Sequence, residues 1–117
     1  MRRIIYISGP ITGCDNYYEH FEEVAEHIHT LDPDCITINP AALIQASNGV
    51  GTNETIYERI LEMDCGLVSD ADAIVMLPGW TNSKGARKEL LTALEENIDI
   101  FDYSDNFEYK FSQYVNS

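Results

Sequence analysis

Positively charged residues are scarce in this chain of 117 residues. Seven Lys and Arg stand against 20 Asp and Glu, which gives a formal net charge of −13 at pH 7. Nucleic-acid backbones and anionic membrane surfaces are bound by cationic faces, so this balance excludes both as expected partners. A small anionic ligand stays compatible with it, because a group of backbone N–H donors can hold an anion in an acidic protein.

Cysteine is rare, and long apolar runs are missing. The cysteines are Cys14, Cys35 and Cys65. They form neither a CxxC pair nor a zinc spacing, and the three histidines also lack metal spacing and are expected to be solvated, so we expect no metal and no cofactor. An odd cysteine count without a secretory signal predicts a cytoplasmic protein. No apolar run approaches the roughly 20 residues of a membrane-spanning helix.

What the sequence does contain is an alternation of strand and helix patterns. Strand patterns, which are β-branched apolar runs, cover residues 3–8, 35–39, 72–78 and 98–103. Helical spacing of apolar residues covers residues 16–31, 54–68 and 83–97, with Leu90, Leu91 and Leu94 expected to face inward. This order predicts a single α/β domain over residues 1–117, with a parallel sheet covered by helices on both faces. Residues 102–117 are expected to be a C-terminal tail that can include a short helix.

Ligands of parallel α/β sheets bind at the carboxyl ends of the strands. Three loops meet that description here, at residues 9–14, 40–53 and 78–83. The third loop ends at Ser83, a good N-cap residue, and Gly85 follows in the first helical turn. The N–H groups of that helix terminus form a ready site for a phosphate or a carboxylate. The alternative is that Ser83 only caps the helix and that Gly85 only allows close packing.

Glu89 lies four residues after Gly85, on the same face of the expected helix. Helical side chains lean toward the N-terminus, so the carboxylate of Glu89 is expected to lean over Gly85 toward the strand ends. The helix N-terminus favours the ionised carboxylate, which suits a nucleophile or an electrostatic stabiliser. The alternative is a solvated surface acid in a very acidic chain.

Three further side chains are candidates for the same cleft. Asp64 shares a helical face with Val68, and partial burial would raise its pKa and suit it to proton donation. The alternative is an acid at the edge of the apolar stripe that is satisfied by a hydrogen bond. Tyr6 lies near the end of the first strand, where its hydroxyl could reach the cleft or could serve the core. Trp80 lies in the third loop, where it could stack on a base or pack on its own domain.

The sequence resembles the nucleoside 2-deoxyribosyltransferase superfamily over residues 3–101. The resemblance is carried by "IYISGPITG", "INPA", "MDCGLVSDADAIVMLPGW" and "SKGARKE". It is greatest to a subgroup of small, mostly uncharacterised bacterial and phage proteins, related to the 2′-deoxynucleoside 5′-phosphate N-hydrolases. The resemblance implies a Rossmann-like, flavodoxin-like three-layer sandwich with a four- to five-stranded parallel sheet, assembled as a homodimer or a larger homo-oligomer.

The resemblance also implies roles for individual residues. Glu89 would attack C1′ of the deoxyribose, Asp64 would protonate or position the leaving base, and Tyr6 would support the nucleophile. The reaction would follow the two-carboxylate retaining scheme. Substrate-binding positions would be Gly9, Ile11, Ser83, Gly85 and Trp80.

Two departures from the family pattern concern a phosphate. Ser83 stands where transferases of free nucleosides carry Asp, and a serine there is similar to the 5′-phosphate hydrolases. Those hydrolases also use a Ser and an Arg in the first loop, where this chain has Pro10 and Thr12. Lys84 or Arg87 could supply the missing charge.

The sequence supports one leading hypothesis for the function and leaves two alternatives open. The leading hypothesis is an enzyme that cleaves or transfers the N-glycosidic bond of a 2′-deoxynucleotide or deoxynucleoside. The first alternative is a non-catalytic nucleotide-binding or regulatory module. The second is an oligomeric domain whose cleft has lost its use.

Overall fold

The computed structural model describes residues 2–11, 15–41 and 63–117. Within them, four strands form one sheet in the order β2-β1-β3-β4, with all neighbouring pairs parallel. The strands are β1 (Ile4–Ser8), β2 (Ile36–Ile38), β3 (Ala73–Met76) and β4 (Asp99–Asp102). Each observed strand lies inside a predicted one. The predicted parallel α/β sheet is confirmed.

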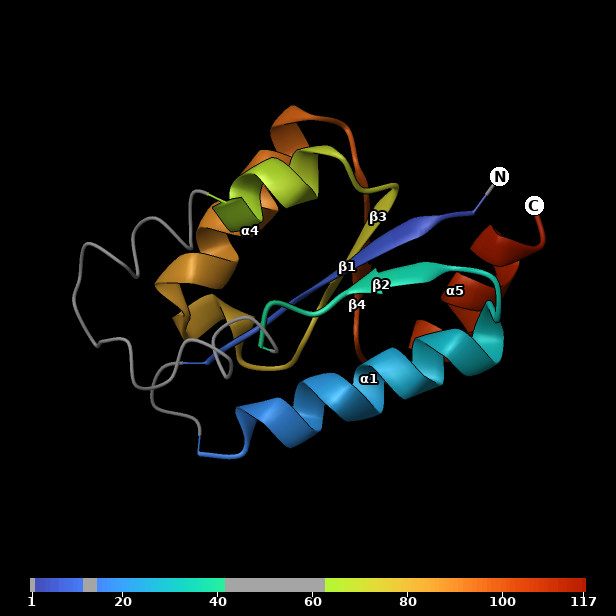
Figure 1. Ribbon diagram of the computed structural model, residues 1–117, viewed down its shortest axis with the longest axis horizontal. Coiled ribbons are helices and arrows are strands. Elements are labelled where there is room, and N and C mark those ends of the chain that lie inside the picture. Colours follow the sequence, from blue (N-terminus) through green and yellow to red (C-terminus); the bar gives the residue numbers. More distant parts are fainter. Residues whose placement is uncertain (1, 12–14, 42–62) are drawn as a thin grey trace.

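Helices cover both faces of this sheet and make a three-layer sandwich (Figure 1). They are α1 (Tyr17–Leu31), the 3₁₀ helix η1 (Trp80–Asn82), α4 (Lys84–Glu95), α5 (Phe107–Val115) and a further helical stretch at residues 63–69. α1 and α5 lie on one face, and α4 and residues 63–69 lie on the other (Figure 1). The predicted loop at 40–53 and the first part of the predicted helix at 54–68 fall largely outside the described residues.

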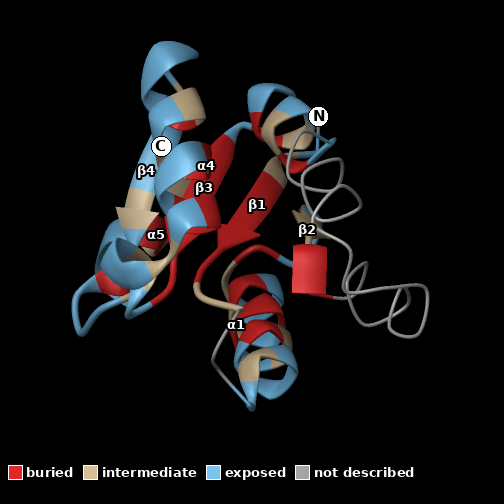
Figure 2. Cartoon of the chain, turned by 90° about the vertical axis from the view of Figure 1, so that its left-hand side faces the viewer, coloured by how far each residue is buried: buried red, intermediate tan, exposed pale blue. Residues whose placement is uncertain are grey.

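The two faces of β1 carry different chemistry because successive strand side chains point to opposite sides. Ile5 and Ile7 pack into the apolar cluster under α1 and α5, whereas Tyr6 belongs to the cluster under α4. The central strands β1 and β3 are buried between the helices along most of their length, whereas the edge strands β2 and β4 are partly exposed (Figure 2). The polar residues of β1 therefore face α4, and this fact positions the candidate site.

The C-terminal segment contains the short helix that the sequence allowed, and this helix packs into the core. Phe107 and Phe111 on α5 are 1% and 0% exposed, and their rings stack with centroids 5.2 Å apart. The ring of His27 on α1 contacts Phe107, and its Nδ1 lies 2.9 Å from the hydroxyl of Tyr103. His27 is therefore a partly buried packing residue, although the sequence predicted a solvated one.

One arginine ties the first strand to the last helix. Arg3 Nη2 donates a hydrogen bond to the carbonyl of Val115 at 2.8 Å, and its guanidinium lies over the ring of Tyr114. Its Nη1 lies 3.2 Å from Asp32 Oδ2. The two chain ends are accordingly close together (Figure 1). None of the helices within the described parts of the chain has the length and apolar character that crossing a membrane requires.

The leucines of α4 do not point where their spacing suggested. Leu91 and Leu94 are 55% and 58% exposed, and only Leu90 packs partly against the core. The buried face of α4 consists of Gly85, Ala86, Glu89 and Ala93. Small residues on this face let the helix lie close to the sheet, and the two large leucines are turned outward as a consequence.

The contribution of α5 to stability can be measured by truncating one ring. Phe111→Ala is expected to lower the free energy of unfolding by about 3–5 kcal/mol, because it opens a cavity at a fully buried position. Tyr109→Ala, on the same helix at 67% exposure, is a matched control expected to change it by less than about 0.5 kcal/mol. Urea unfolding gives both values. Equal effects of the two variants would contradict the placement of α5 in the core.

Candidate active site

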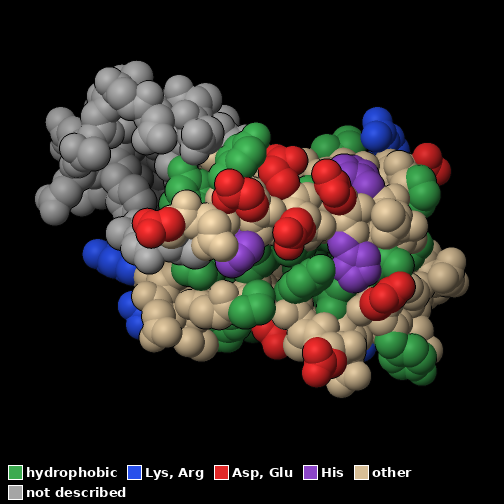
Figure 3. Space-filling model, turned by 90° about the horizontal axis from the view of Figure 1, so that it is seen from below, with side chains coloured by type: hydrophobic (Ala, Val, Ile, Leu, Met, Phe, Trp, Pro, Cys, Tyr) green, Lys and Arg blue, Asp and Glu red, His purple; other side chains and the backbone are tan. Residues whose placement is uncertain are grey.

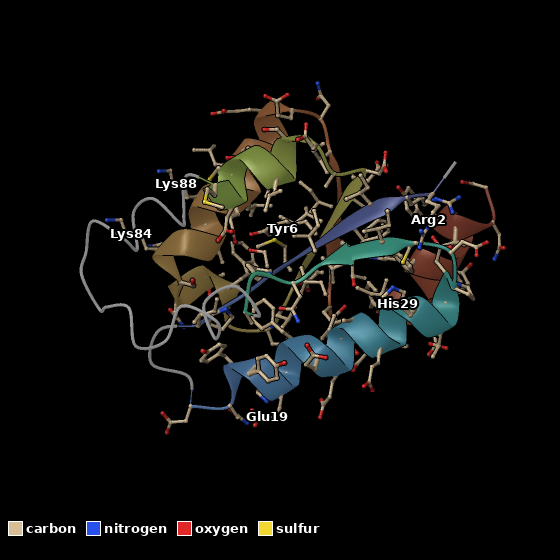
Figure 4. All side chains as sticks on the ribbon, in the orientation of Figure 1. Arg2, Tyr6, Glu19, His29, Lys84 and Lys88 are labelled. Carbon is tan, nitrogen blue, oxygen red and sulfur yellow. The ribbon has the colours of Figure 1, made fainter. Side chains whose placement is uncertain are left out.

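Two hydroxyl side chains of β1 point toward α4. Tyr6 and Ser8 are two residues apart on the strand, so they share a face, and both are 0% exposed. Figure 4 shows Tyr6 inside the molecule between the sheet and the helices of this face. A buried hydroxyl needs a hydrogen-bond partner, and α4 supplies it.

That partner is the carboxyl group of Glu89, which is 5% exposed. Ser8 Oγ donates to Glu89 Oε1 at 2.6 Å, and the hydroxyl of Tyr6 donates to Glu89 Oε2. Glu89 reaches the strand because Gly85 and Ala86, one turn earlier, are small and buried against the sheet. Glu89 is thus a buried residue joined to β1 and not a solvated surface acid.

Burial changes the expected ionisation of Glu89. Loss of solvent raises the pKa of Glu89 above its ordinary value, and the hydrogen bonds from Ser8 and Tyr6 oppose this rise only in part. Desolvation is the larger effect on this pKa, although the two hydroxyl donors and the helix N-terminus favour the ionised carboxylate. Burial and the nearby charge of Glu89 raise the pKa of Tyr6 far above its ordinary value, so its phenol is a neutral donor at physiological pH.

Asp64 brings a second buried carboxyl group to the same place. It belongs to helical residues 63–69 and is 4% exposed. Burial first, and the charge of Glu89 second, raise the pKa of Asp64 from 3.8 to about 7. Its Oδ1 is buried without a hydrogen-bond partner among the described residues. Burial of Asp64 thus acts on its pKa in the direction that the sequence predicted.

The hydrogen bonds around the two carboxyl groups favour different protonation states for them. Glu89 accepts two hydrogen bonds, which stabilise the ionised form, and Asp64 Oδ1 has no such donor in the described structure. When one proton is shared within such a pair, it is expected on Asp64 and not on Glu89. The arrangement therefore offers one nucleophilic carboxylate and one proton donor near pH 7.

The sequence matches, over residues 3–102, a family described as a domain of unknown function, DUF4406. The chain belongs to this family. No curated protein matches the chain. The DUF4406 match includes Tyr6, Ser8, Asp64 and Glu89, whereas helix α5 lies beyond it. The cluster of hydroxyl and carboxyl groups is thus contained in the DUF4406 segment.

Three of the remaining predicted site residues of this DUF4406 protein lie at α4 or on its face of the sheet. Ser83 is the N-cap of α4, and its Oγ accepts a hydrogen bond from the N–H of Ala86 at 3.2 Å. Gly85 is buried at the start of the same helix. Trp80 packs partly against the core cluster under α4, on the same face of the sheet as Tyr6.

Gly9 and Ile11 are not brought to the carboxyl groups by any described contact. A Cβ on Gly9 would lie 2.7 Å from Cβ of Leu77, so glycine is needed here for close approach of the loops after β1 and β3. Ile11 packs against the cluster under α1 and α5, on the opposite face from Tyr6. Thr12 lies outside the described residues.

Sequence reasoning missed Ser8, which is one of the two donors to Glu89. The signal was present, because Ser8 lies two residues after Tyr6 and therefore on the same face of a buried strand. A polar residue at such a position needs a buried partner. Groups of three or more metal-binding side chains do not occur among the residues that the structure describes.

The raised pKa of Asp64 predicts a particular dependence of stability on pH. The pKa of the Asp64 carboxyl is 3.8 in the unfolded chain and about 7 in the folded one, so between these pH values the folded state holds more protons. Stability contributed by the neutral carboxyl is therefore present at low pH and is lost as pH rises toward 7. Asp64→Asn removes this loss. Between about pH 4 and pH 8, the free energy of unfolding of Asp64→Asn relative to that of wild type should therefore rise by on the order of 2–4 kcal/mol.

Urea unfolding over this pH range measures the difference directly. Asp70→Asn is the matched control, because Asp70 is exposed just after the same helical stretch and its replacement should leave the wild-type pH dependence unchanged. Parallel pH profiles for wild type and Asp64→Asn would show that Asp64 titrates normally and would remove it as a proton donor.

Proposed function

We propose that this protein cleaves the N-glycosidic bond of a 2′-deoxynucleotide or deoxynucleoside through a covalent intermediate on Glu89. The observation that carries the proposal is a buried carboxyl group held by two hydroxyl donors beside a second carboxyl whose pKa is raised to about 7. A pair of carboxyl groups with separated proton affinities is what retaining glycoside cleavage requires. The resemblance of the sequence to the nucleoside 2-deoxyribosyltransferase superfamily supports the same reaction.

In the first step, Glu89 attacks C1′ of the deoxyribose and the bond from C1′ to the base nitrogen breaks. The base leaves with the bonding electron pair and takes a proton from Asp64. The developing charge on the sugar is that of an oxocarbenium ion, which the adjacent carboxylate stabilises. The products of this step are the free base, a glycosyl ester of Glu89 and an ionised Asp64.

In the second step, water attacks C1′ and the ester bond to Glu89 breaks. Asp64 accepts the proton that water loses, so both carboxyl groups return to their starting states. If a second base attacks C1′ in place of water, a new N-glycosidic bond forms as the ester bond to Glu89 breaks, and the reaction is a transfer. Tyr6 and Ser8 hold the Glu89 oxygens throughout and limit rotation of the nucleophile.

The α4 terminus supports a substrate with a 5′-phosphate. α4 is a 12-residue helix with Ser83 at its N-cap, and the N-terminus of a helix favours a negative charge. Lys84 and Arg87 are exposed in its first turns and could add positive charge. A nucleotide bound there would place its sugar toward Glu89, one turn further along α4.

The reaction is tested by measuring free base released from a panel of deoxynucleosides and their 5′-phosphates. Glu89→Gln is expected to lower release by on the order of 10³-fold or more, because it removes the nucleophile and keeps the shape. Glu96→Gln is the matched control, since Glu96 is exposed at the end of the same helix and its replacement should leave the wild-type rate unchanged. Chromatographic separation of base from nucleotide is the readout.

Two results would contradict the proposal. Release of base by Glu89→Gln at the wild-type rate would remove Glu89 as nucleophile. Saturable nucleotide binding by wild type without any release of base would favour a nucleotide-binding module. A shift of the thermal midpoint in a nucleotide panel detects that binding independently of turnover.

We further propose that the protein forms a homodimer through the outer face of α4. This face is defined by exposed residues at helical spacing: Lys84, Arg87, Lys88, Leu91, Leu94 and Glu95. Figure 4 shows Lys84 and Lys88 directed away from the sheet. Antiparallel pairing of two copies near Leu91 would bury the leucines and bring Lys88 of each copy to Glu95 of the other.

Light scattering after size-exclusion chromatography tests this interface. Lys88→Glu is expected to weaken the dimer several-fold by like-charge repulsion, and Lys88→Glu combined with Glu95→Lys is expected to restore it. Leu94→Glu should give monomers, whereas Tyr109→Glu, which changes an exposed ring on α5, should not. A monomeric wild type, or a double variant no better than the single one, would refute the proposed interface.

A further inference from the structure

A cavity of about 230 Å³ lies on the face of the sheet opposite to the carboxyl cluster. Phe21 and Val24 of α1 form one wall, and Leu77 and Pro78, which follow β3, form another. Tyr103, directly after β4, closes the far side. The cavity therefore sits at the carboxyl ends of the strands, where α/β sheets bind ligands, but under α1 and not under α4.

The size of the cavity fits one small ring. An apolar protein cavity of roughly 150 Å³ is large enough to hold benzene. The volume here leaves room for a ring and a short polar arm. Most of the lining is apolar, with Pro10 adding to the walls already named.

The polar end of the cavity is negatively charged. Glu23 and His20 line it, and neither Lys nor Arg occurs among its lining residues. Burial, together with the charges of Glu23 and Glu108, raises the pKa of Tyr103 above its ordinary value, which indicates a negative potential at this end. Figure 3 shows the same face, with acidic and histidine side chains around apolar ones and Lys and Arg only at the margins. This charge disfavours a nucleotide or another anion relative to a cation.

We propose that this cavity binds a small organic cation, with an apolar ring between α1 and the β3 loop and a protonated amine at Glu23. The ring replaces water against Phe21, Val24 and Leu77, and this burial supplies most of the affinity. The ammonium group meets the exposed carboxylate of Glu23, which selects a cation over a neutral molecule of the same shape. This site and its ligand are independent of the reaction proposed for Glu89.

The cavity and the carboxyl cluster lie on two sides of the same strand ends. The backbone N–H of Leu77 donates to the carbonyl of Ser8 at 2.7 Å, while the Ser8 hydroxyl donates to Glu89. An added cation could also be drawn to the carboxyl groups of Glu89 and Asp64. The experiment must therefore separate binding at Glu23 from binding at the catalytic cluster.

Benzylammonium is the probe, and benzyl alcohol and benzoate are its neutral and anionic counterparts. Titration into ¹⁵N-labelled protein should give saturable shifts at the amides of Val24 and Leu77, with a Kd on the order of 1 mM for a ligand of this size. Benzyl alcohol should bind about threefold to tenfold more weakly, and benzoate more weakly still. Equal binding of the three probes, or no saturable shift at these amides, would overturn the proposal.

Three variants locate the binding. Glu23→Gln should weaken benzylammonium about threefold to tenfold, whereas Glu26→Gln, an identical change at an exposed position of α1 outside the cavity, should leave it unchanged. Glu89→Gln should also bind as wild type. Loss of binding in Glu89→Gln with retention in Glu23→Gln would assign the cation to the carboxyl cluster and refute the site. Neither Glu23→Gln nor Glu26→Gln threatens folding, because both residues are exposed on α1.

Discussion

The carboxyl group of Glu89 is held between two hydroxyl groups of β1, and this contact fixes how α4 lies on the sheet. A buried carboxylate is costly unless its oxygens accept hydrogen bonds, and here Tyr6 and Ser8 donate one to each oxygen. A shift of α4 along the strand or a rotation about its axis would break at least one of them. The small residues Gly85 and Ala86 allow the close approach that these bonds need.

Asp64 shows that this part of the core is not arranged for stability alone. Its carboxyl group is as buried as that of Glu89, yet its Oδ1 lacks a partner in the described structure and its pKa rises to about 7. Two apolar side chains of similar size would pack in these positions at lower cost. Local rules of core design are broken most often where a protein acts, so the violation itself points to chemistry at this place.

Much of this arrangement was predictable, because it depends on local patterns. The four strands and α1 follow from apolar periodicity, and the nomination of Glu89 follows from its position four residues after Gly85. Packing between helices and strands was harder to predict from the sequence. The leucines of α4 point outward because Glu89 and small residues occupy the inner face, and spacing alone does not tell which of two apolar stripes meets the sheet. The core position of α5 also depends on contacts with α1, which sequence neighbours do not reveal.

The ionisation of Glu89 was the least accessible property, because it is decided by a balance between distant parts of the chain. The helix terminus and two hydroxyl donors favour the charged form, whereas burial under α4 opposes it, and burial is the larger effect. The same strand ends separate this cluster from an apolar cavity with an acidic rim on the other face of the sheet. One sheet edge thus carries a polar environment on one face and an apolar one on the other, because alternation along β1 sends hydroxyl groups to one face and isoleucines to the other. The anion proposed for the α4 terminus and the cation proposed for Glu23 would therefore lie on opposite faces of the sheet and would not compete for one site.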